Sequence, residues 1–588
     1  MFKIQPALVA FSIGSGTLLL GVADANAAKV ENLAYDLGVI RVVIPKIEAT
    51  GTALTVDALK GIVDPAGSAT LAQRLGILNA ASIVAPQIIF EIKTGPAGNK
   101  ITYRDVKLAN VGSGVIESAT VAGAGGDLVD PVAGPMKITY GAMSMRKVNL
   151  GLILRVFSTP RADPNEPSVS AYEDFAADGF QMTSRDVDVS MGKMTGSGVK
   201  MRALAMPIGD LVTLSQQLGA PGAKPSPQQT AQIFSMLGDI FQSMELGKVE
   251  MRDMKVNVKK DNGAIGIGRI VMSGFAKGKL GEVAYENLTM NMPDGTAKLG
   301  RFGFRDLDMQ RTFATMADAM KRGDTEFRNT NPRDLVPTLG QFQISGLDLD
   351  VPDKNGAGNS PDGQRIRFSL GNFEINTTKH IEGIPTAITA RVQNFLFPIP
   401  PKPMDAQLRD IAAMGIDKFD LNHTIDIAWN EATQEIALKD YSISLGGLGS
   451  VKLTGVIGNT PKDLFSSNLA LAQAAAFGAV LKSVDLTVEN MGLAQKALQF
   501  QAKQSGQTPQ QLQQMMVAGA AMGIPAMLGN GAASKAIAGA LSKFAADPKK
   551  LRLAARSKNG VGVADAMQAA GNPAGLLESL EVTATANE

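Results

Sequence analysis

The chain has 588 residues, of which 45% are hydrophobic and 19% charged, so it can bury a large core and is too apolar to be a disordered polyampholyte. Its formal net charge is +2 and its basic residues are dispersed, which argues against nucleic-acid binding, because that function needs a concentrated positive surface. Cysteine is absent, which excludes disulfides, thiolate catalysis and cysteine-based zinc sites.

The first residues have the layout of a signal peptide. Lys3 precedes an apolar run over residues 7–22, and the small residues Ala25 and Ala27 suit a signal peptidase. We expect residues 1–27 to be removed, which makes the mature protein periplasmic. The alternative is an uncleaved signal that anchors the protein in the inner membrane.

An eight-residue pattern recurs along the chain and is its strongest internal signal. It can be written apolar-x-apolar-x-(Asp/Asn/Gly)-apolar-x-apolar. Looser copies occur at residues 138–145 and 182–189. The good copies are Ile101–Leu108, Val249–Val256, Val283–Met290, Phe302–Met309, Phe342–Leu349, Phe368–Ile375 and Ile436–Ile443.

Each half of this pattern has the two-residue period of a β-strand, but the halves are offset by one residue. A straight strand would turn the second set of apolar side chains to the wrong face. We therefore expect a β-bulge or tight corner at the fifth position, where the residue types tolerate a left-handed backbone. Some copies can arise by chance in any β-rich chain. The fifth residues are Asp105, Asp253, Asn287, Asp306, Gly346, Asn372 and Asp440.

Bent strands of this kind predict a mainly β fold with helical insertions. The sheet is expected to be long, curved, twisted and antiparallel, forming a groove or half-barrel lined by positions one, three, six and eight, with a C-terminal helical cap. Turn signals between the copies favour hairpins, and we expect on the order of 20 strands.

The expected regions follow from these patterns in chain order. Helical periodicity predicts a helical pair at 208–219 and 227–246 and single helices at 311–323 and 403–415. The chain then becomes rich in Ala and Met and reads as helical up to Pro548, after which the last residues alternate as a strand. The regions are 28–205, an N-terminal β region; 206–246, a helical insertion; 247–458, a central β-groove region; and 459–588, a helix-rich cap with final strands.

No motif in the sequence names a reaction. His380 and His423 lie far apart, and we expect both to be exposed or at strand edges. Residues 94–102 contain a glycine-rich turn that leads into a strand, whereas a phosphate loop must open a helix. No G-x-S-x-G elbow is present. We therefore expect no catalytic residue, no cofactor and no metal site, and a protein that is not an enzyme.

Two further features of the sequence resemble binding signals. Arg-Asp steps occur at residues 104–105, 185–186, 252–253 and 305–306, and we interpret them as a bend residue beside an outward, solubilising arginine. The Ala/Met-rich region at 510–545 is expected to pack over an open sheet edge or trough mouth. Its alternative role is reversible contact with a bilayer surface or a partner.

The repeated bent strands, the Gly-rich stretch at 441–458 and the Gln-rich stretch at 488–514 resemble the AsmA/YdgA-like group of bacterial envelope proteins. That resemblance implies an elongated periplasmic β-groove with a role in envelope maintenance, carrying lipid acyl chains along an apolar trough. The expected cleavable signal departs from the anchored members of that group.

Three functional interpretations remain at this point. The first is a non-enzymatic periplasmic protein that binds phospholipid acyl chains, approaches a membrane surface or assists envelope maintenance. The second is a structural or partner-binding β-scaffold with a closed core and no ligand. The third, an outer-membrane barrel, is disfavoured by the low aromatic content of 5% and the absence of a terminal aromatic residue.

Overall fold

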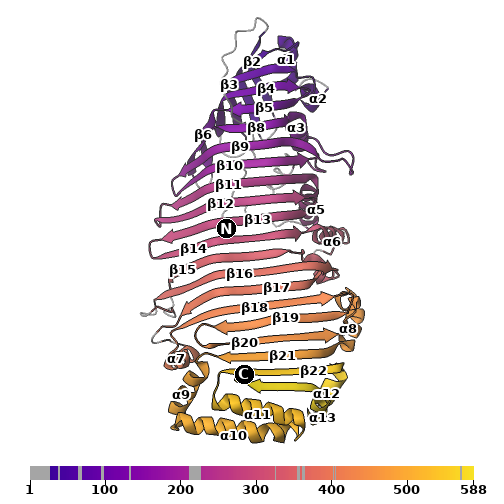
Figure 1. Ribbon diagram of the computed structural model, residues 1–588. Coiled ribbons are helices and arrows are strands. Elements are labelled where there is room, and N and C mark those ends of the chain that lie inside the picture. The colour runs from indigo at the N-terminus through magenta and orange to yellow at the C-terminus, as the bar shows by residue number, and fades with distance from the viewer. Residues whose placement is uncertain are drawn as a thin grey trace. The chain divides into compact units, whose positions relative to one another are not determined.

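The computed structural model describes residues 27–588 except 37–39, 64–68, 70, 94–97, 131–133, 209, 211–226, 325, 354–357, 361–363, 401–402, 404 and 570–572. Over these residues the protein is mainly β, and its 23 strands belong to one antiparallel sheet with helices at its C-terminal end (Figure 1). The expected fold class is confirmed. The expected signal peptide, apart from Ala27, and most of the expected helix at 208–219 lie outside the described residues.

The chain divides into two compact units. The first comprises residues 1–293 and 305–337, the second residues 294–304 and 338–588, and β14 (Gly295–Asp308) contributes to both. The first unit contains β1 (Ala28–Asp36), β2 (Ile40–Thr50), β3 (Ala80–Ile92), β4 (Lys100–Gly112), β5 (Val115–Val121), β6 (Gly123–Asp130), β7 (Gly134–Tyr140), β8 (Met143–Asn149), β9 (Val169–Ser184), β10 (Val187–Met201), β11 (Met244–Val258), β12 (Gly263–Ala276) and β13 (Lys279–Met292). Its helices are α1 (Val56–Val63), α2 (Leu71–Leu75), α3 (Leu150–Ser158), α5 (Pro227–Ser243), α6 (Gln310–Lys321) and the short η2 (Pro332–Leu335).

The second unit continues with strands and ends in helices. Its strands are β15 (Gln341–Pro352), β16 (Arg365–Ile381), β17 (Ile384–Pro398), β18 (Lys418–Asn430), β19 (Glu435–Leu445), β20 (Gly449–Gly458), β21 (Val480–Asn490), β22 (Lys550–Gly562) and β23 (Glu581–Ala586). Its helices are α7 (Ala406–Ala413), η3 (Lys462–Phe465), α8 (Leu469–Gly478), α9 (Leu493–Ser505), α10 (Pro509–Leu528), α11 (Ala532–Ala546), α12 (Val563–Ala569) and α13 (Pro573–Glu578).

The first copy of the repeated pattern shows how the offset works. On β4, Ile101, Tyr103 and Val106 are 2%, 6% and 3% exposed and belong to one core cluster, so positions one, three and six share a face. Asp105, between the last two, has a left-handed backbone with φ 51°. The left-handed residue therefore reverses the parity of the strand, which means that the apolar positions change from odd to even residue numbers. The apolar side chains thus stay on the core side along the whole strand.

Five of the seven fifth-position residues have this left-handed backbone, with φ between 51° and 63°. Asn372 does not, which contradicts the expectation for that copy; its neighbour Gly371 is the residue that faces the bend of the next strand. Asp440 lies instead at a register shift of β19 against both β18 and β20, which is the expected bulge. The five left-handed residues are Asp105, Asp253, Asn287, Asp306 and Gly346.

A bulge is the wrong description for most of the bends. Between β11 and β12 the register is the same on both sides of Asp253, because Arg252 pairs with Arg269 and Met254 pairs with Ile267. Asp253 therefore faces Gly268, which reverses parity on its own strand at the same level. Since both strands shift together, the ladder of hydrogen bonds continues in register.

These matched positions line up across the strands in rows. Across β9–β13 the row alternates left-handed residues with glycines of ordinary φ, and a Cβ atom at Gly268 would lie only 3.0 Å from the Cβ of Asn287. The same alternation occurs across β10–β13 and, in the second unit, across β14–β17. The rows are Gly179, Gly192, Asp253, Gly268 and Asn287; Gly198, Gly247, Gly274 and Gly281; and Gly300, Gly346, Gly371 and Asn394.

The helices agree with most of the expected positions. The helices expected at 227–246, 311–323 and 403–415 correspond to α5, α6 and α7, and the expected helical stretch before Pro548 contains α9, α10 and α11. β21, however, lies at 480–490 in a part expected to be helix-rich, because its alternating Val484, Leu486 and Val488 suit a strand. No helix in the described residues is both long and apolar enough to cross a bilayer.

We predict that the bend residues are selected for backbone conformation. Asn287→Val should lower the free energy of unfolding by about 1–3 kcal/mol, because a β-branched residue is strained at φ 54°. Asn287→Gly should stay within about 1 kcal/mol of the native protein, since glycine adopts this conformation without strain. Urea unfolding of the two variants makes the comparison, and equal midpoints would contradict the proposed role of the backbone.

Candidate ligand-binding face

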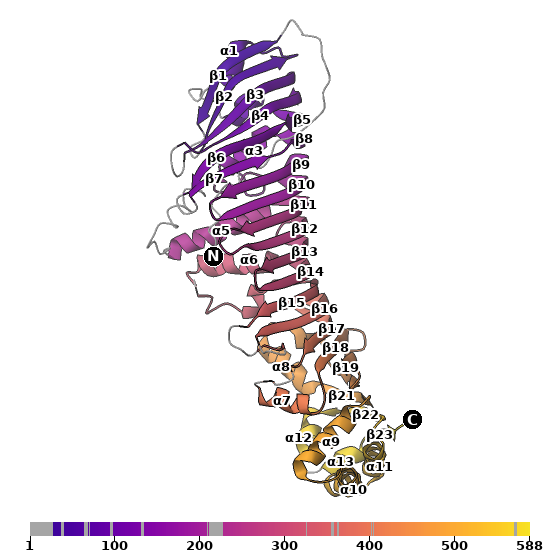
Figure 2. The ribbon, with the colours of Figure 1, turned by 90° about the vertical axis from the view of Figure 1, so that its left-hand side faces the viewer.

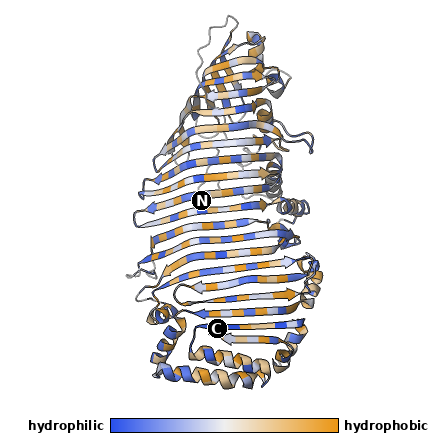
Figure 3. Ribbon diagram, viewed as in Figure 1, coloured by the Kyte–Doolittle hydropathy of each residue, from blue (hydrophilic) through white to orange (hydrophobic). Residues whose placement is uncertain are grey.

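One face of the second unit is a continuous set of apolar rows. Antiparallel partners lie on the same face of a sheet, so the register of β15–β20 groups the side chains directly. Figure 3 shows the corresponding alternation of hydrophilic and hydrophobic residues along the strands. The rows, named here the apolar face, are Phe342, Ile375, Ala390, Ile425, Tyr441 and Leu453; Ile344, Phe373, Val392, His423, Ile443 and Val451; and Leu347, Leu370, Phe395, Leu421 and Leu445.

Within the part of the chain that the structure describes, no layer buries the apolar face as a core is buried. None of its side chains is fully buried: all keep intermediate exposure except Val451, which is 38% exposed. By contrast, Ile101 in the core of the first unit is 2% exposed. The same two-residue pattern therefore produces a closed core in β1–β9 and a partly exposed apolar surface in β15–β20.

Helices cover only the margins of this face. Ile399, Ile416 and Leu448 form a small cluster with residues at the end of α7, and Trp429 packs edge-on against Phe465 of η3 at 5.0 Å. At the other margin, α11 packs against β22 and β23 through a cluster that includes Leu551. Leu445 of the third row packs against the cluster of Ile399, Ile416 and Leu448, and the other residues of the rows belong to none of the buried clusters found among the described residues.

The opposite face of the sheet in the second unit is polar and carries cross-strand ion pairs, both within β15–β20 and between β21 and β22. Arg365 Nε lies 2.5 Å from Asp350 Oδ1, and Arg552 Nη2 lies 2.5 Å from Asp485 Oδ2. Hydrogen bonds from these arginines lower the pKa of both aspartates. The second unit therefore has one face suited to water and one suited to apolar material.

Neither histidine is exposed, and only His423 lies away from a strand end, because His380 is the penultimate residue of β16. They lie within strands and are half-buried, His380 on β16 and His423 on β18, and burial lowers the pKa of His380. His423 is part of the apolar face: its Nδ1 is 2.8 Å from the Ser442 carbonyl oxygen, and its ring packs edge-on against Tyr441. Among the described residues no cluster of three or more His, Asp or Glu could hold a metal ion.

In the first unit, helices cover one end of the corresponding rows. Figure 2 shows α5 and α6 together beside β11–β13. Phe241 of α5 packs against Phe275 of β12 at 5.4 Å and stacks on Phe313 of α6 at 4.8 Å. Leu152 and Val156 of α3 join Leu246 in a second buried cluster.

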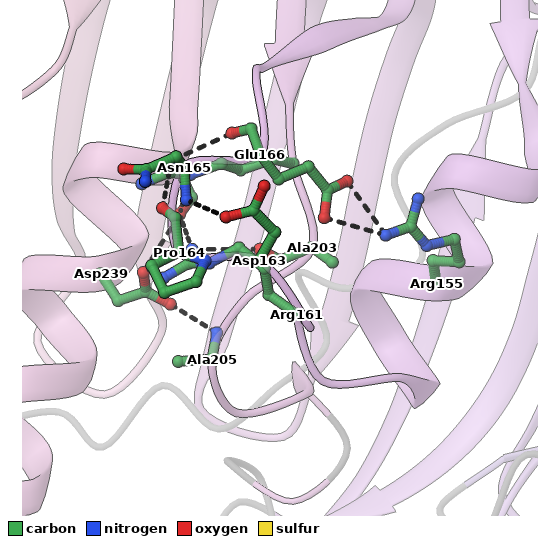
Figure 4. Close-up of polar contacts among 11 residues, drawn as sticks. Arg155, Arg161, Asp163, Pro164, Asn165, Glu166, Ala203, Ala205 and Asp239 are labelled. Carbon is green, nitrogen blue, oxygen red and sulfur yellow. Dashed lines mark hydrogen bonds and ion pairs between the residues drawn. The ribbon is translucent and has the colours of Figure 1, made fainter.

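A buried polar cluster fixes α5 to the segments before β9 and after β10 (Figure 4). Arg161 Nη1 donates to Asp239 Oδ1 at 2.8 Å, and the two side chains are 11% and 14% exposed. The second Asp239 oxygen accepts from the backbone N–H of Ala205 at 2.7 Å. Arg202 Nε and Arg161 Nη1 both donate to the hydroxyl of Ser243 at 3.1 Å.

The surroundings of this cluster indicate a structural role. Arg202 Nη1 also donates to the carbonyl oxygens of Pro164 and Glu166, and Arg155 makes two 3.0 Å bonds to the Glu166 carboxylate. The donors and acceptors thus already have protein partners. The cluster ties three chain segments together. Sequence reasoning missed it because its members are scattered over residues 155–243.

The Arg-Asp steps are only partly as expected. Asp105, Asp253 and Asp306 are bend residues, and the arginine beside Asp253 pairs with a neighbouring residue of its own strand. Residues 185 and 186 differ, because they lie in the turn between β9 and β10 and form an ion pair with each other at 3.0 Å. All four Arg-Asp steps lie in the first unit, so none of them contributes to the apolar face of the second unit.

Glu250 on β11 is the centre of an ion-pair network on the polar face of the first unit. Its carboxylate is 7% exposed and contacts Lys248 at 2.7 Å, Arg252 at 2.5 Å and Arg269 at 3.0 Å. Arg269 also pairs with Glu286 on β13 at 3.0 Å. Hydrogen bonds from Arg269, Lys248 and Arg252 lower the pKa of Glu250 to about 2.

We predict a pH-dependent contribution from this network. Because the folded-state pKa of Glu250 is below its ordinary value of 4.5, its stabilising effect is complete above pH 4.5 and is lost as the pH falls toward 2. Glu250→Gln should therefore unfold at lower urea than the native protein at pH 7, with a difference that shrinks through this window. A difference that stays constant from pH 7 to pH 2 would contradict the assignment.

We also predict that α5 depends on the Arg161–Asp239 pair. Asp239→Ala leaves a buried guanidinium without its carboxylate and should lower the local stability of α5 by about 2–3 kcal/mol. Amide hydrogen exchange in α5 measures this loss. The control is Asp318→Ala, which removes an exposed ion pair with Lys321 on α6 and should leave exchange in α5 unchanged. Equal exchange in the two variants would rule out the anchoring role.

Comparison with known proteins gives little functional information. A family model described as an uncharacterized protein matches residues 442–587, which include β20–β23 and α8–α13. No curated protein matches the sequence significantly.

Proposed function

We propose that this is a non-enzymatic, exported envelope protein that holds lipid acyl chains against the apolar face of its second unit. The observation that carries the proposal is that this face is apolar in register across β15–β20 and yet only half-buried. The rows contain no Asp, Glu, Lys or Arg. Export to the periplasm is supported by the signal-like layout of residues 1–27.

The chemistry of the face suits hydrocarbon chains. Burying a methylene group contributes about 0.8 kcal/mol, so a chain that buries about ten methylenes gains about 8 kcal/mol before the entropic costs of binding. A non-directional contact of this kind needs no specific polar partner. The rows run across the strands, so an extended chain can lie along one row and contact a side chain from each strand.

A scaffold with a closed core is the second candidate, and it is favoured by the first unit. The cluster around Ile101, Met143 and Val148 is fully buried by the protein's own side chains. We therefore limit the proposed ligand to the second unit and assign β1–β9 a structural role.

The test compares two neighbouring residues that face opposite ways on β18. Ile425→Asp places a carboxylate on the apolar face and should weaken the binding of a fluorescent fatty acid at least tenfold. Thr424→Asp, on the polar face, should bind like the native protein. Both side chains have intermediate exposure, so the two variants place a carboxylate at comparable burial on opposite faces, and circular dichroism checks that both are folded.

Lipid extraction of the purified native protein provides the independent measurement. Phospholipid or fatty acid should be recovered from the native protein and from Thr424→Asp, and in lower amount from Ile425→Asp. A native protein that is free of lipid and does not bind the fluorescent probe would favour the scaffold.

A further inference from the structure

Helix α10 presents an exposed apolar surface that the acyl-chain proposal does not use. Met515, Met516, Met522 and Met527 are 59%, 58%, 71% and 72% exposed, and we name them the methionine surface. The 20 residues of α10 include no charged side chain. An exposed patch of this kind is typical of a protein-binding or membrane-binding site.

The opposite side of α10 is held by α11, so the methionine surface is fixed in place. Gln513 Nε2 donates to the carbonyl oxygens of Ala545 and Ala546 at 3.1 and 2.8 Å, and Ser542 Oγ donates to the Val517 carbonyl oxygen at 3.4 Å. Thr508 and Gln511 close the N-terminus with a capping box. Figure 1 shows α10 and α11 side by side, with α10 at the lower margin of the view.

The charge along the sequence of α9–α11 points to the kind of partner, and an acidic residue beside these helices is Glu578 of α13, next to the start of α11. Residues 491–546, which include α9–α11, contain four lysines and no Asp, Glu or Arg, although the whole chain has a net charge of only +2. Lys503, Lys535 and Lys543 are exposed, whereas Lys496 donates to the Gly415 carbonyl oxygen. Flexible apolar side chains together with exposed lysines match the two layers of an anionic bilayer surface, its acyl region and its headgroups.

We propose that the methionine surface docks on the surface of a bilayer that contains anionic phospholipid. The thioether side chains enter the boundary between headgroups and acyl chains, and the lysines contact phosphates. The helix lies on the bilayer, since it carries Gln residues and Pro525 and belongs to no membrane-spanning segment. This inference stands independently of the acyl-chain proposal, because it uses other residues and a different face.

Vesicle co-sedimentation of the purified protein tests it. Vesicles that contain phosphatidylglycerol should sediment the native protein, and pure phosphatidylcholine vesicles should sediment much less. The variant M515S/M516S/M522S/M527S should lose at least tenfold in partitioning. The variant K503Q/K535Q/K543Q should lose about fivefold per lysine at low salt.

The controls separate this surface from general charge and from lipid uptake. K29Q/K193Q/K321Q removes three other exposed lysines and should partition like the native protein. Ile425→Asp should also partition normally, since it alters only the apolar face.

Three results would overturn the proposal: no binding to anionic vesicles, equal binding to both vesicle types, or binding that the methionine and lysine variants leave unchanged. Self-association that depends on the four methionines, without vesicle binding, would instead identify a protein interface.

Discussion

The pairing of a left-handed residue with a glycine on the next strand decides which face each apolar side chain occupies. A strand that reverses parity alone would lose register with its neighbours or turn its apolar residues toward water. Here Asp253 and Asn287 reverse their strands at the level of Gly268, so all three strands change together. Glycine is favoured there because a Cβ would lie only 3.0 Å from the Asn287 Cβ.

The same strand pattern, with its apolar side chains on one face, is buried in the first unit and partly exposed in the second. In β1–β9 the apolar side chains meet each other and form a core that includes Ile116 and Ile138 at 2% and 1% exposure. In β15–β20 the apolar residues remain half-exposed, while the polar face carries ion pairs such as Arg391 with Glu374. A sheet with one apolar and one polar face is stable in water only if the apolar side is small, covered or occupied, which is why we place the proposed ligand there.

The sequence predicts the bent strands because their cause is local. The parity offset and the residue types at positions such as Asp105 and Asn287 can be read within eight residues, and both have the expected left-handed backbone. The matching glycines could not be predicted, because Gly268 acquires its role only from the strand that lies beside it. Asn372 shows the limit of the pattern: it occupies the fifth position, but the neighbouring Gly371 faces the bend of β17.

The candidate sites also have a part that local sequence predicts and a part that it does not. Positions one, three, six and eight predict the residues that β15, β16 and β19 contribute to the apolar face, whereas the residues of β17, β18 and β20 follow only from the register of the strands. Only the three-dimensional arrangement shows that no layer within the described residues covers the middle of the rows. The polar cluster around Asp239 depends on contacts between residues far apart in sequence, so it left no local signal. β21 was missed because its Val484, Leu486 and Val488 follow the helical, Ala-rich stretch that ends with α8.

The rows of glycine also have a mechanical consequence. Each row crosses the strands and replaces large side chains with backbone, so it forms a line along which the sheet is thin on both faces. Folding about such a crease changes the curvature of the sheet while the hydrogen bonds between strands, which lie parallel to the crease, are retained. In the second unit the crease through Gly300, Gly346 and Gly371 separates two apolar fields, with Phe342 and Phe373 on one side and Leu347 and Leu370 on the other. Hinging about this crease would change the angle between the two fields without breaking the hydrogen bonds between strands, and under the acyl-chain proposal it would let the face fit one chain or several.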